Sequence, residues 1–429
     1  VCPSTLKWNW AREANMWLKD VTVRVLGGFC KRSVWTVREN EIAIINDDVL
    51  ADQLDKEGKI RRKGWASLLM RAGYKTLILD ECHRIKNVKK KTIVKDNGEK
   101  YKVPACKKAD TVLQFAKQVK YFLPISGTPI ENRPAEFFPT LNALSPELFP
   151  NWWTFAHRYC AAKSNGWGWD FKGASNTEEL HQILVNSVMI RRLKKDVLKD
   201  LPPKVRSVIP MEIDLKQYEK AETELLSYVA KLQGKSAAKD PKQKAEGLAT
   251  IERLKQAAVL GKLKASIEWI EDYLESGKKL VVFATHQFVL DELQNHFKKR
   301  CVRVDGSTST SNRMKIVDIF QGDDSVSLFI GNIRAAGVGI TLTAASDTLT
   351  LELGWTPGGH DQAEDRVHRI GQDADSVTAY YIVAKDTIEE DIAALLDEKR
   401  DVLAQVMDGK PAKDRDMLTV LLKKYAEKL

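Results

Sequence analysis

Short apolar runs alternate with longer helical patterns along much of the chain. Most of these runs end in a loop of polar or small residues, which an amphipathic stretch follows. This alternation is typical of an α/β fold with a doubly wound parallel sheet, in which ligands bind at the carboxyl ends of the strands. The strands that the runs predict are residues 41–45, 76–79, 121–125, 280–284, 302–304, 326–330 and 348–353.

The alternation falls into two blocks, which predict two α/β lobes. We expect a first lobe over residues 1–133 and a second over 262–385, joined by helical insertions and a linker over 134–261. Residues 214–275 are strongly helical, with a polar stretch at 231–247 that predicts a solvated turn. The C-terminal part, 386–429, is expected to form brace helices, the first opened by a capping box from Thr387 to Glu390.

Composition and charge narrow the class of protein. A chain of 429 residues is too long for one ordinary core, and no apolar run approaches the roughly 20 residues that span a bilayer, so no membrane partner is expected. Lys and Arg (68) exceed Asp and Glu (58), and the net charge of +10 favours a polyanionic partner, although charge that serves only solubility remains the alternative. The six cysteines lack the spacing of a zinc knuckle, which predicts a reduced, intracellular protein without structural zinc.

Residues 134–200 are rich in aromatic side chains. Such side chains can stack on nucleobases, but the small core of a helical insertion is the favoured interpretation. The aromatic residues are Phe137, Phe138, Phe149, Trp152, Trp153, Phe155, Trp167 and Trp169.

Two carboxylates follow the apolar run at 76–79. Asp80 and Glu81 would lie at the carboxyl end of a strand, and strand alternation would turn them to different sides. One can hold Mg²⁺, which prefers oxygen ligands, and the other can orient or deprotonate a water molecule. The alternative is an acidic cap on the helix that follows.

A second strand, predicted to be buried at 121–125, runs into Ser126-Gly127-Thr128-Pro129. Two hydroxyl groups around a glycine at a strand end suit a hinge that senses a phosphate or a carboxylate. A routine turn is the alternative.

The second block carries Gln362, Arg366 and Arg369. Spacings of four and three residues would place them on one helical face. Two guanidinium groups and an amide on one stripe suit a clamp on a γ-phosphate, in which one arginine contributes about a thousandfold or more in rate. A solvated helix face is the alternative.

The order and spacing of these motifs resemble those of superfamily-two helicase motors, and specifically of Swi/Snf-type DNA translocases. The resemblance covers residues 1 to about 405, and Cys82 stands where many relatives have alanine. The residues of the motif at 362–372 resemble those of the annealing-helicase branch. The stretches that match in order are 3–10, 80–87, 126–132, 335–345, 355–357 and 362–372.

The resemblance implies two RecA-like lobes, ATP and Mg²⁺ as cofactors, and double-stranded or branched DNA as partner. It implies that Asp80 holds Mg²⁺, that Glu81 activates the attacking water, and that His83 has a coupling role. Arg366 and Arg369 would be arginine fingers across the interlobe cleft, with Gln362 beside them. Gly337 and Gly339 would approach the nucleotide, and the residues along the DNA backbone would be Ser4, Thr5, Thr128, Gly306, Thr341 and Thr343.

One family motif has no counterpart in the sequence. The family begins its first lobe with a strand and a Gly-rich loop ending in Gly-Lys-Thr, which cradles phosphates. The single Gly-Lys-Ser, at 234–236, follows a helical segment and lacks the upstream glycine. We therefore expect the first lobe to be truncated upstream of Val1 and to expose an apolar sheet edge.

This missing loop leaves two functions open. The intact protein is expected to be a DNA-stimulated ATPase, whereas this chain alone would be a nucleic-acid-binding remnant without ATP turnover. An RNA helicase is disfavoured, because the residues at 362–372 resemble the motif of DNA translocases. The source is expected to be prokaryotic or viral, with action in the cytoplasm, or in the nucleus if the source is eukaryotic. A lysine-rich hairpin at 86–108, around Asp96-Asn97-Gly98, suits either phosphate contact or protection of an exposed strand.

Overall fold

The computed structural model describes residues 1–429 apart from 56–58, 86–89, 95–99, 105, 128, 131–132, 165–167, 172, 233–240, 338, 409–420 and 422–429. Residues Val1–Ile190 and Val402–Asp414 belong to one unit, and Arg191–Asp401 and Arg415–Leu429 belong to a second unit. Each unit is described by itself. No helix in the described part of the chain combines the length and the hydrophobicity needed to cross a bilayer.

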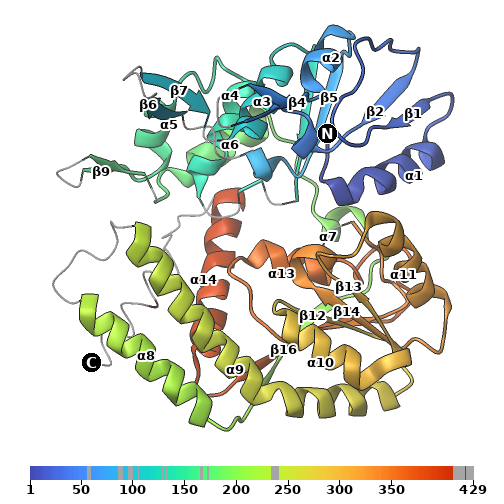
Figure 1. Cartoon of the computed structure of the whole chain (residues 1–429), viewed down its shortest axis with the longest axis vertical. Coiled ribbons are helices and arrows are strands. Elements are labelled where there is room, and N and C mark those ends of the chain that lie inside the picture. The colour runs from blue at the N-terminus through green and yellow to red at the C-terminus, as the bar shows by residue number, and fades with distance from the viewer. Residues whose placement is uncertain are drawn as a thin grey trace. The chain divides into compact units, whose positions relative to one another are not determined.

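The second unit contains a six-stranded sheet in which all neighbouring strands are parallel. The strand order is β11-β16-β15-β12-β14-β13. This confirms the α/β class and the parallel sheet. Figure 1 labels β12, β13, β14 and β16 of this sheet. The strands are β11 (Lys204–Met211), β12 (Leu280–Ala284), β13 (Cys301–Val304), β14 (Leu328–Asn332), β15 (Asp347–Thr350) and β16 (Val377–Ala384).

The central strand β12 is buried on both faces, because side chains alternate across the sheet. Leu280, Val282 and Ala284 pack into one core, and Val281 and Phe283 pack into another. The neighbouring strands and the helices on each face supply the rest of both cores, which explains the continuous apolar run of this strand. These helices are α9 (Pro241–Glu275), α10 (Gln287–Phe297), α11 (Thr310–Gly322), α12 (Ile333–Ala336) and α13 (Pro357–Glu364), with the short η5 (Lys298–Arg300) after α10.

One predicted strand is displaced by two residues. The run at 326–330 predicted a strand from Val326, whereas β14 begins at Leu328. Val326 instead closes the turn after α11, since its N–H donates to the carbonyl of Asp323 at 3.2 Å.

Two strands of this sheet, β11 and β16, were not among those expected. β11 is an edge strand, paired only with β16, and it lies within the segment expected to be linker. Its alternating exposed positions and its Pro210 suit a sheet edge, where a missing N–H is tolerated. The sheet therefore begins earlier in the chain than residue 262.

Three long helices complete the second unit. α8 (Lys216–Leu232) and α9 confirm the helical prediction for 214–275. The turn predicted at 231–247 is wrong at 241–247, which begin α9, and 233–240 lie outside the described residues. α14 (Ile388–Asp408) begins where the capping box predicted, and its residues from Val402 on belong to the first unit; α7 (Lys194–Val197) precedes β11. The Thr387 hydroxyl accepts from the Glu389 N–H at 3.2 Å and donates to the Ala384 carbonyl at 2.9 Å. Glu389 is buried, and its carboxylate accepts from Ala384 N–H and from Lys262.

The first unit has two pairs of parallel strands, β1 with β2 and β5 with β8. Val1 and Cys2 join them, because Cys2 pairs with Asn46 after β2 and the Val1 carbonyl accepts from the Asp80 N–H at 2.8 Å. The main strands are β1 (Thr22–Val25), β2 (Glu41–Ile44), β5 (Thr76–Asp80) and β8 (Tyr121–Ile125), with a small antiparallel pair, β3 (Gln53–Leu54) and β4 (Ile60–Arg62). The helices are η1 (Ser4–Leu6), α1 (Lys7–Trp17), η2 (Asp47–Val49), α2 (Ala66–Arg71), η3 (Cys82–Ile85) and α3 (Lys107–Ala116).

The prediction that β8 is a buried strand is wrong. Tyr121, Leu123 and Ile125 are 51%, 46% and 43% exposed, and Ile78 of β5 is 37% exposed. One face of this strand pair is therefore apolar and open to solvent.

The aromatic insertion has a core of its own, as predicted. Phe137, Phe138, Phe149 and Phe155 are buried together, with ring centroids of Phe138 and Phe155 5.2 Å apart. Trp153 and Trp169, by contrast, are about half exposed, and Trp167 lies outside the described residues. The elements are η4 (Pro134–Glu136), α4 (Phe138–Leu144), α5 (Trp152–Tyr159), β9 (Lys163–Ser164), β10 (Trp169–Asp170) and α6 (Thr177–Ser187).

The lysine-rich segment after the acidic residues forms the predicted hairpin. β6 (Lys90–Val94) and β7 (Lys100–Pro104) pair antiparallel, with Val94 opposite Lys100. The expected turn at 96–98 lies outside the described residues.

Candidate functional site

The acidic residues stand where β5 ends. Glu81 has a φ of 52°, a left-handed conformation that is uncommon for a residue other than glycine and that clusters at functional sites. The segment that follows is η3, a single short turn of 3₁₀ helix. So short a turn has little dipole, so a capping role explains two adjacent carboxylates poorly.

Trp10 and His83 contact these carboxylates directly, and Ser126 contacts His83. The Trp10 indole N–H of α1 donates to Asp80 Oδ2 at 2.7 Å, and the Glu81 N–H donates to Asp80 Oδ1 at 2.9 Å. His83 Nδ1 lies 3.3 Å from Glu81 Oε2 and 3.0 Å from Ser126 Oγ at the end of β8. The structure thus gathers Asp80, Glu81, His83 and Ser126, as parallel strands with adjacent carboxyl ends require.

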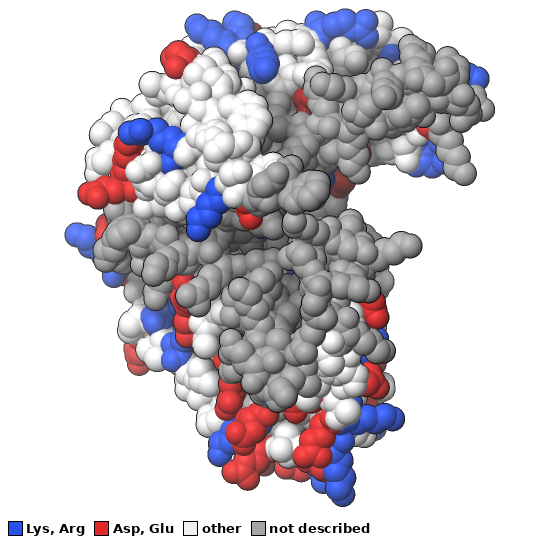
Figure 2. Space-filling model, turned by 90° about the vertical axis from the view of Figure 1, so that its left-hand side faces the viewer, with Lys and Arg blue, Asp and Glu red and all other residues white. Residues whose placement is uncertain are grey.

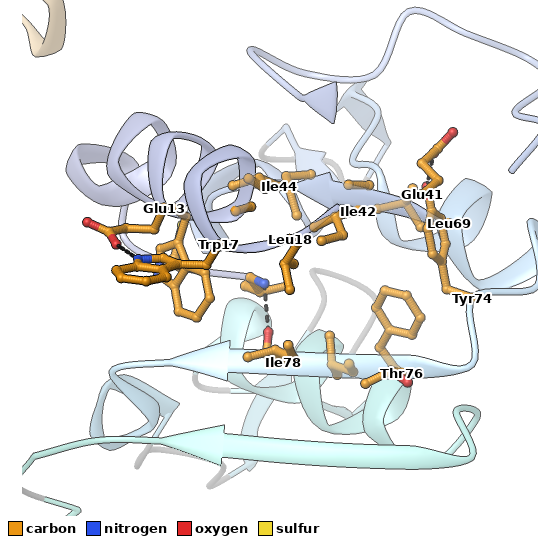
Figure 3. A pocket seen from close by; sticks show the side chains of 18 residues that line it. Glu13, Trp17, Leu18, Glu41, Ile42, Ile44, Leu69, Tyr74, Thr76 and Ile78 are labelled. Carbon is orange, nitrogen blue, oxygen red and sulfur yellow. Dashed lines mark hydrogen bonds between the residues drawn. The ribbon is translucent and has the colours of Figure 1, made fainter. Parts of the chain in front are cut away.

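A pocket of about 400 Å³ opens beside this cluster, between β2 and β5 (Figure 3). Trp10 lines this pocket and also donates a hydrogen bond to Asp80, but Asp80, Glu81 and His83 are not part of the pocket lining. The Val1 ammonium group donates to the Ile78 carbonyl at 2.7 Å, and burial lowers the pKa of this ammonium group. Because the walls are largely apolar, the pocket is a poor site for a charged phosphate. The lining residues drawn with labels are Glu13, Trp17, Leu18, Glu41, Ile42, Ile44, Leu69, Tyr74, Thr76 and Ile78.

Ser4 and Thr5, the candidate DNA contacts of the first unit, begin η1 immediately before α1. The Ser4 side chain is exposed, and Thr5 is half-buried. The third candidate of this unit, Thr128, lies outside the described residues.

The glycines of the second unit occupy restricted positions. A Cβ on Gly337 would lie 2.3 Å from the Ile333 carbonyl oxygen, so no side chain fits there. Gly339 has a φ of 76°, which favours glycine. Both flank Val338, which lies outside the described residues.

Arg366 contacts the loop that carries these glycines. Its Nε donates to the Gln362 carbonyl at 2.8 Å and one terminal nitrogen donates to the Ile340 carbonyl at 3.3 Å. The Arg366 carbonyl accepts from the Leu342 N–H at 2.9 Å. The structure therefore brings together residues 340–342 and 362–366, which the sequence separates by about twenty positions.

The expectation that Gln362, Arg366 and Arg369 share one helical face is wrong. α13 ends at Glu364, and residues 365–371 form turns that close at Gly371, which has a φ of 90°. Only Gln362 is helical. The geometry of the two arginines is set by loop contacts instead of by helical periodicity.

Two glutamines that had not been singled out for this role hold that loop. The Gln372 amide donates to the carbonyls of Thr343, Ala345 and Val367. The Gln321 amide donates to Thr343 Oγ1 at 3.2 Å. The sequence signal that pointed to either glutamine was the position of Gln372 at the end of the motif at 362–372.

Gly306 and Thr341 are the remaining candidates. Gly306 follows Asp305, whose carboxylate accepts from the Ser307 N–H at 2.9 Å, and a Cβ at Gly306 would meet no atom within 4 Å. Burial raises the pKa of Asp305, but hydrogen bonds from Ser307 and Gln287 outweigh burial and hold that pKa well below its ordinary value. Thr341 is half-buried, one residue beyond Ile340.

Charge alone does not mark a nucleic-acid surface on the face that Figure 2 shows. Among the described residues of that face, basic and acidic side chains are interspersed. In the described part of the chain, no three His, Cys, Asp or Glu side chains are grouped so as to hold a metal ion.

Parallel α/β units with acidic residues at a strand end and arginines at a turn define the class of helicase-type motor domains. A model of the SNF2-related domain matches residues 1–259, more than half of the chain, and a model of the helicase conserved C-terminal domain matches residues 262–371. This chain belongs to the SNF2-related family.

Curated relatives cover nearly all of the chain. A SWI/SNF-related matrix-associated actin-dependent regulator of chromatin subfamily A-like protein 1 from Xenopus laevis is 35% identical over 94% of this chain and 39% of the relative. The human DNA annealing helicase and endonuclease ZRANB3 is 32% identical over 96% of this chain and 36% of the relative. The chain thus spans less than half the length of these relatives.

A solved structure of the Sulfolobus solfataricus SWI2/SNF2 ATPase core in complex with dsDNA is 23% identical to the chain. The alignment covers 100% of this chain and 84% of that one, with a TM-score of 0.43.

Proposed function

We propose that this chain is the motor part of a DNA translocase that hydrolyses ATP and uses it to move on, or remodel, duplex DNA. The observation that carries the proposal is the series of contacts from Asp80 to Glu81, from Glu81 to His83 and from His83 to Ser126, in a chain of the SNF2-related family. A hydrolase needs a carboxylate that holds an ion and a second one that handles water, and these two lie side by side.

Asp80 is the residue proposed to hold Mg²⁺. Each of its oxygens accepts one hydrogen bond and keeps a lone pair. Mg²⁺ is usually bound through one or two carboxylates together with substrate phosphates and water. A single carboxylate therefore suffices, and the described residues need no three-ligand cluster. When bound, the ion neutralises charge that develops on the transferred phosphate.

Glu81 is the residue proposed to orient and deprotonate the attacking water. Its strained backbone sets the direction of the carboxylate, and His83 lies 3.3 Å from one of its oxygens. Because the same His83 nitrogen lies 3.0 Å from Ser126 Oγ, a change in the charge of Glu81 alters the interaction with β8. We infer that this contact couples hydrolysis to the Ser126–Thr128 segment.

In the second unit, Arg366 and Arg369 are proposed to place positive charge on the γ-phosphate, with Gln362 beside them. Gly337 and Gly339 would allow the backbone to approach the nucleotide. The proposed DNA-backbone contacts are Ser4, Thr5, Thr128, Gly306, Thr341 and Thr343.

The relatives support DNA as the partner. One is named as a DNA annealing helicase and others as regulators of chromatin. We propose duplex or branched DNA as the substrate. The named relatives are animal proteins, which agrees with the nuclear alternative and gives no support to a prokaryotic or viral source.

The test is DNA-stimulated ATP hydrolysis by the wild-type chain and by Glu81→Gln. The variant should keep the binding of a fluorescent ATP analogue and lose turnover by about 100-fold or more, since general-base catalysis contributes that much. Glu13→Gln is the matched control, because Glu13 is a half-buried carboxylate whose recorded hydrogen bond is to the Trp17 indole, and it makes no recorded contact with Asp80, Glu81 or His83.

Three outcomes contradict parts of the proposal. Unimpaired hydrolysis by Glu81→Gln rejects the assigned base. DNA binding by the wild-type chain without any turnover favours the alternative, a nucleic-acid-binding chain that does not hydrolyse ATP. Equal stimulation by single-stranded RNA and duplex DNA favours an RNA helicase.

A further inference from the structure

The turn that carries Arg366 and Arg369 is attached to a segment about 160 residues earlier in the chain. Glu364, the last residue of α13, is 2% exposed and accepts four hydrogen bonds. Arg206 of β11 binds it with Nε at 2.7 Å and a terminal nitrogen at 2.8 Å. Lys204 Nζ lies at 2.8 Å and the Tyr381 hydroxyl at 2.5 Å.

These four donors fill the acceptor capacity of the carboxylate, which offers about four lone-pair sites. Burial raises the pKa of Glu364, but the hydrogen bonds and charges of Arg206 and Lys204 outweigh burial and lower that pKa to about 2. Two-point pairing with a guanidinium fixes direction as well as distance. The end of α13 is therefore held in one orientation against β11.

The residues on either side of Glu364 are attached to the same early segment. Arg206 also binds Asp361 at 2.7 Å, and Lys204 binds Asp365 at 3.2 Å. Lys194 of α7 binds Asp365 at 2.8 Å and donates to the His368 carbonyl at 3.0 Å.

The last attachment is made by a side chain of the turn itself. His368 Nε2 lies 2.9 Å from the Pro202 carbonyl. The contacts thus reach positions before Arg366 and positions between Arg366 and Arg369. Residues 365–371 are not helical, so these contacts and those to residues 340–345 position the backbone of the turn from which Arg366 and Arg369 project.

We infer that residues 194–206 are a positioning segment for the arginines of the motor, with Arg206 and Lys204 as its anchors. The inference rests on the proposed function, because positioning has a catalytic meaning only if Arg366 and Arg369 act on a phosphate. This segment begins four residues after Ile190, the last residue of the span Val1–Ile190 of the first unit.

A different account is that the same contacts only stabilise an edge strand. The two accounts predict different results for Arg206→Gln, which removes the charge and the two-point pairing. If Arg206 positions the arginines, kcat for ATP at saturating DNA should fall by about tenfold to a hundredfold, the range expected when a catalytic group is displaced by about an ångström. The KM for ATP and the Kd for DNA without nucleotide should stay within about twofold, since uniform binding is not removed.

Hydrogen exchange of β11 and β16 supplies the readout of stability. Exchange in these strands should match that of the wild type while kcat falls. Lys385→Gln is the matched control: Lys385 binds Glu212 at 3.1 Å, and these residues follow β16 and β11. The control breaks an ion pair between the same two strands, away from the arginine turn, and should leave kcat unchanged.

Arg206→Lys keeps the positive charge on β11 but cannot bind Glu364 through two nitrogens, as the guanidinium does. Its kcat should fall between those of the wild type and Arg206→Gln, which keeps the test decisive if Arg206→Gln fails to fold. A kcat within twofold of the wild type in the glutamine variant, or a loss of kcat that parallels faster exchange in β11 in both variants, would overturn the inference. A wild-type chain without DNA-stimulated hydrolysis would instead contradict the proposed function itself.

Discussion

Lys262 and Glu389 form an ion pair inside the second unit, and its removal gives a quantitative test of how that unit is held together. The two side chains are 1% and 2% exposed, with Nζ and Oε2 2.5 Å apart. Lys262 Nζ also donates to the Ile382 carbonyl at 2.7 Å, and Glu389 Oε2 accepts from the Ala384 N–H at 2.9 Å. The pair therefore joins α9, β16 and α14.

Lys262→Met should destabilise the second unit by about 3–5 kcal/mol, because it leaves a buried carboxylate without its counter-charge. Methionine keeps most of the apolar volume, so a cavity contributes little. With a dependence on urea of roughly 2–3 kcal/mol per molar, the unfolding midpoint should fall by roughly 1–2 M.

Pulsed hydrogen exchange across a urea series is the appropriate assay. Peptides from β12 and α9 follow the second unit alone, since a chain of two units need not unfold in one step. Lys264→Met is the matched control: it lies on the same helix, its side chain is 92% exposed, and Glu268 is 4.0 Å away. It should change stability by less than about 0.5 kcal/mol.

A second variant separates the charge from the packing. In Lys262→Met with Glu389→Gln the buried charge is gone, and the double variant should be about 1–3 kcal/mol more stable than Lys262→Met alone. Equal midpoints for Lys262→Met and Lys264→Met would refute the reasoning. So would a double variant less stable than the single one.

Two further predictions concern the second unit. His286 binds the buried Glu352, and this bond raises the pKa of His286 above 6.5; burial raises the pKa of Glu352, but the bond from His286 outweighs burial and lowers it below 4.5. Glu252 and Lys255 also face His286. The stabilisation is complete between pH 4.5 and 6.5, and it is lost as pH rises through the folded pKa of His286 or falls through that of Glu352. Protection factors correct amide exchange for its faster intrinsic rate at high pH, and factors at the ends of β12 and β15 that are highest at pH 8 would contradict this. Gly337→Ala should cost about 1–3 kcal/mol, because its Cβ would lie 2.3 Å from the Ile333 carbonyl, whereas Gly306→Ala should cost less than about 1 kcal/mol; similar losses in thermal unfolding would contradict the steric argument.

Much of this molecule follows from local rules in the sequence. The run at 280–284 predicts β12 with the same bounds, because a strand buried on both faces needs continuous apolar side chains. Thr387 marks the start of α14, because a hydroxyl at that position satisfies a free N–H. Asp80 and Glu81 could be identified as a candidate site, since they follow an apolar strand at the edge where parallel sheets bind ligands.

Other features depend on contacts between distant segments, and only the tertiary structure decided them. The spacing of Gln362, Arg366 and Arg369 predicted a helix. Periodicity cannot indicate that distant groups, namely the Leu342 N–H, the Gln372 amide and Lys194 of the 194–206 segment, donate hydrogen bonds to the backbone carbonyls of this turn. β11 carries a proline and several charges, and it became a strand because β16 offered a free edge. Local sequence thus determined the strands and the acidic residues, whereas the position of the arginines was determined by a buried carboxylate whose partners lie about 160 residues away.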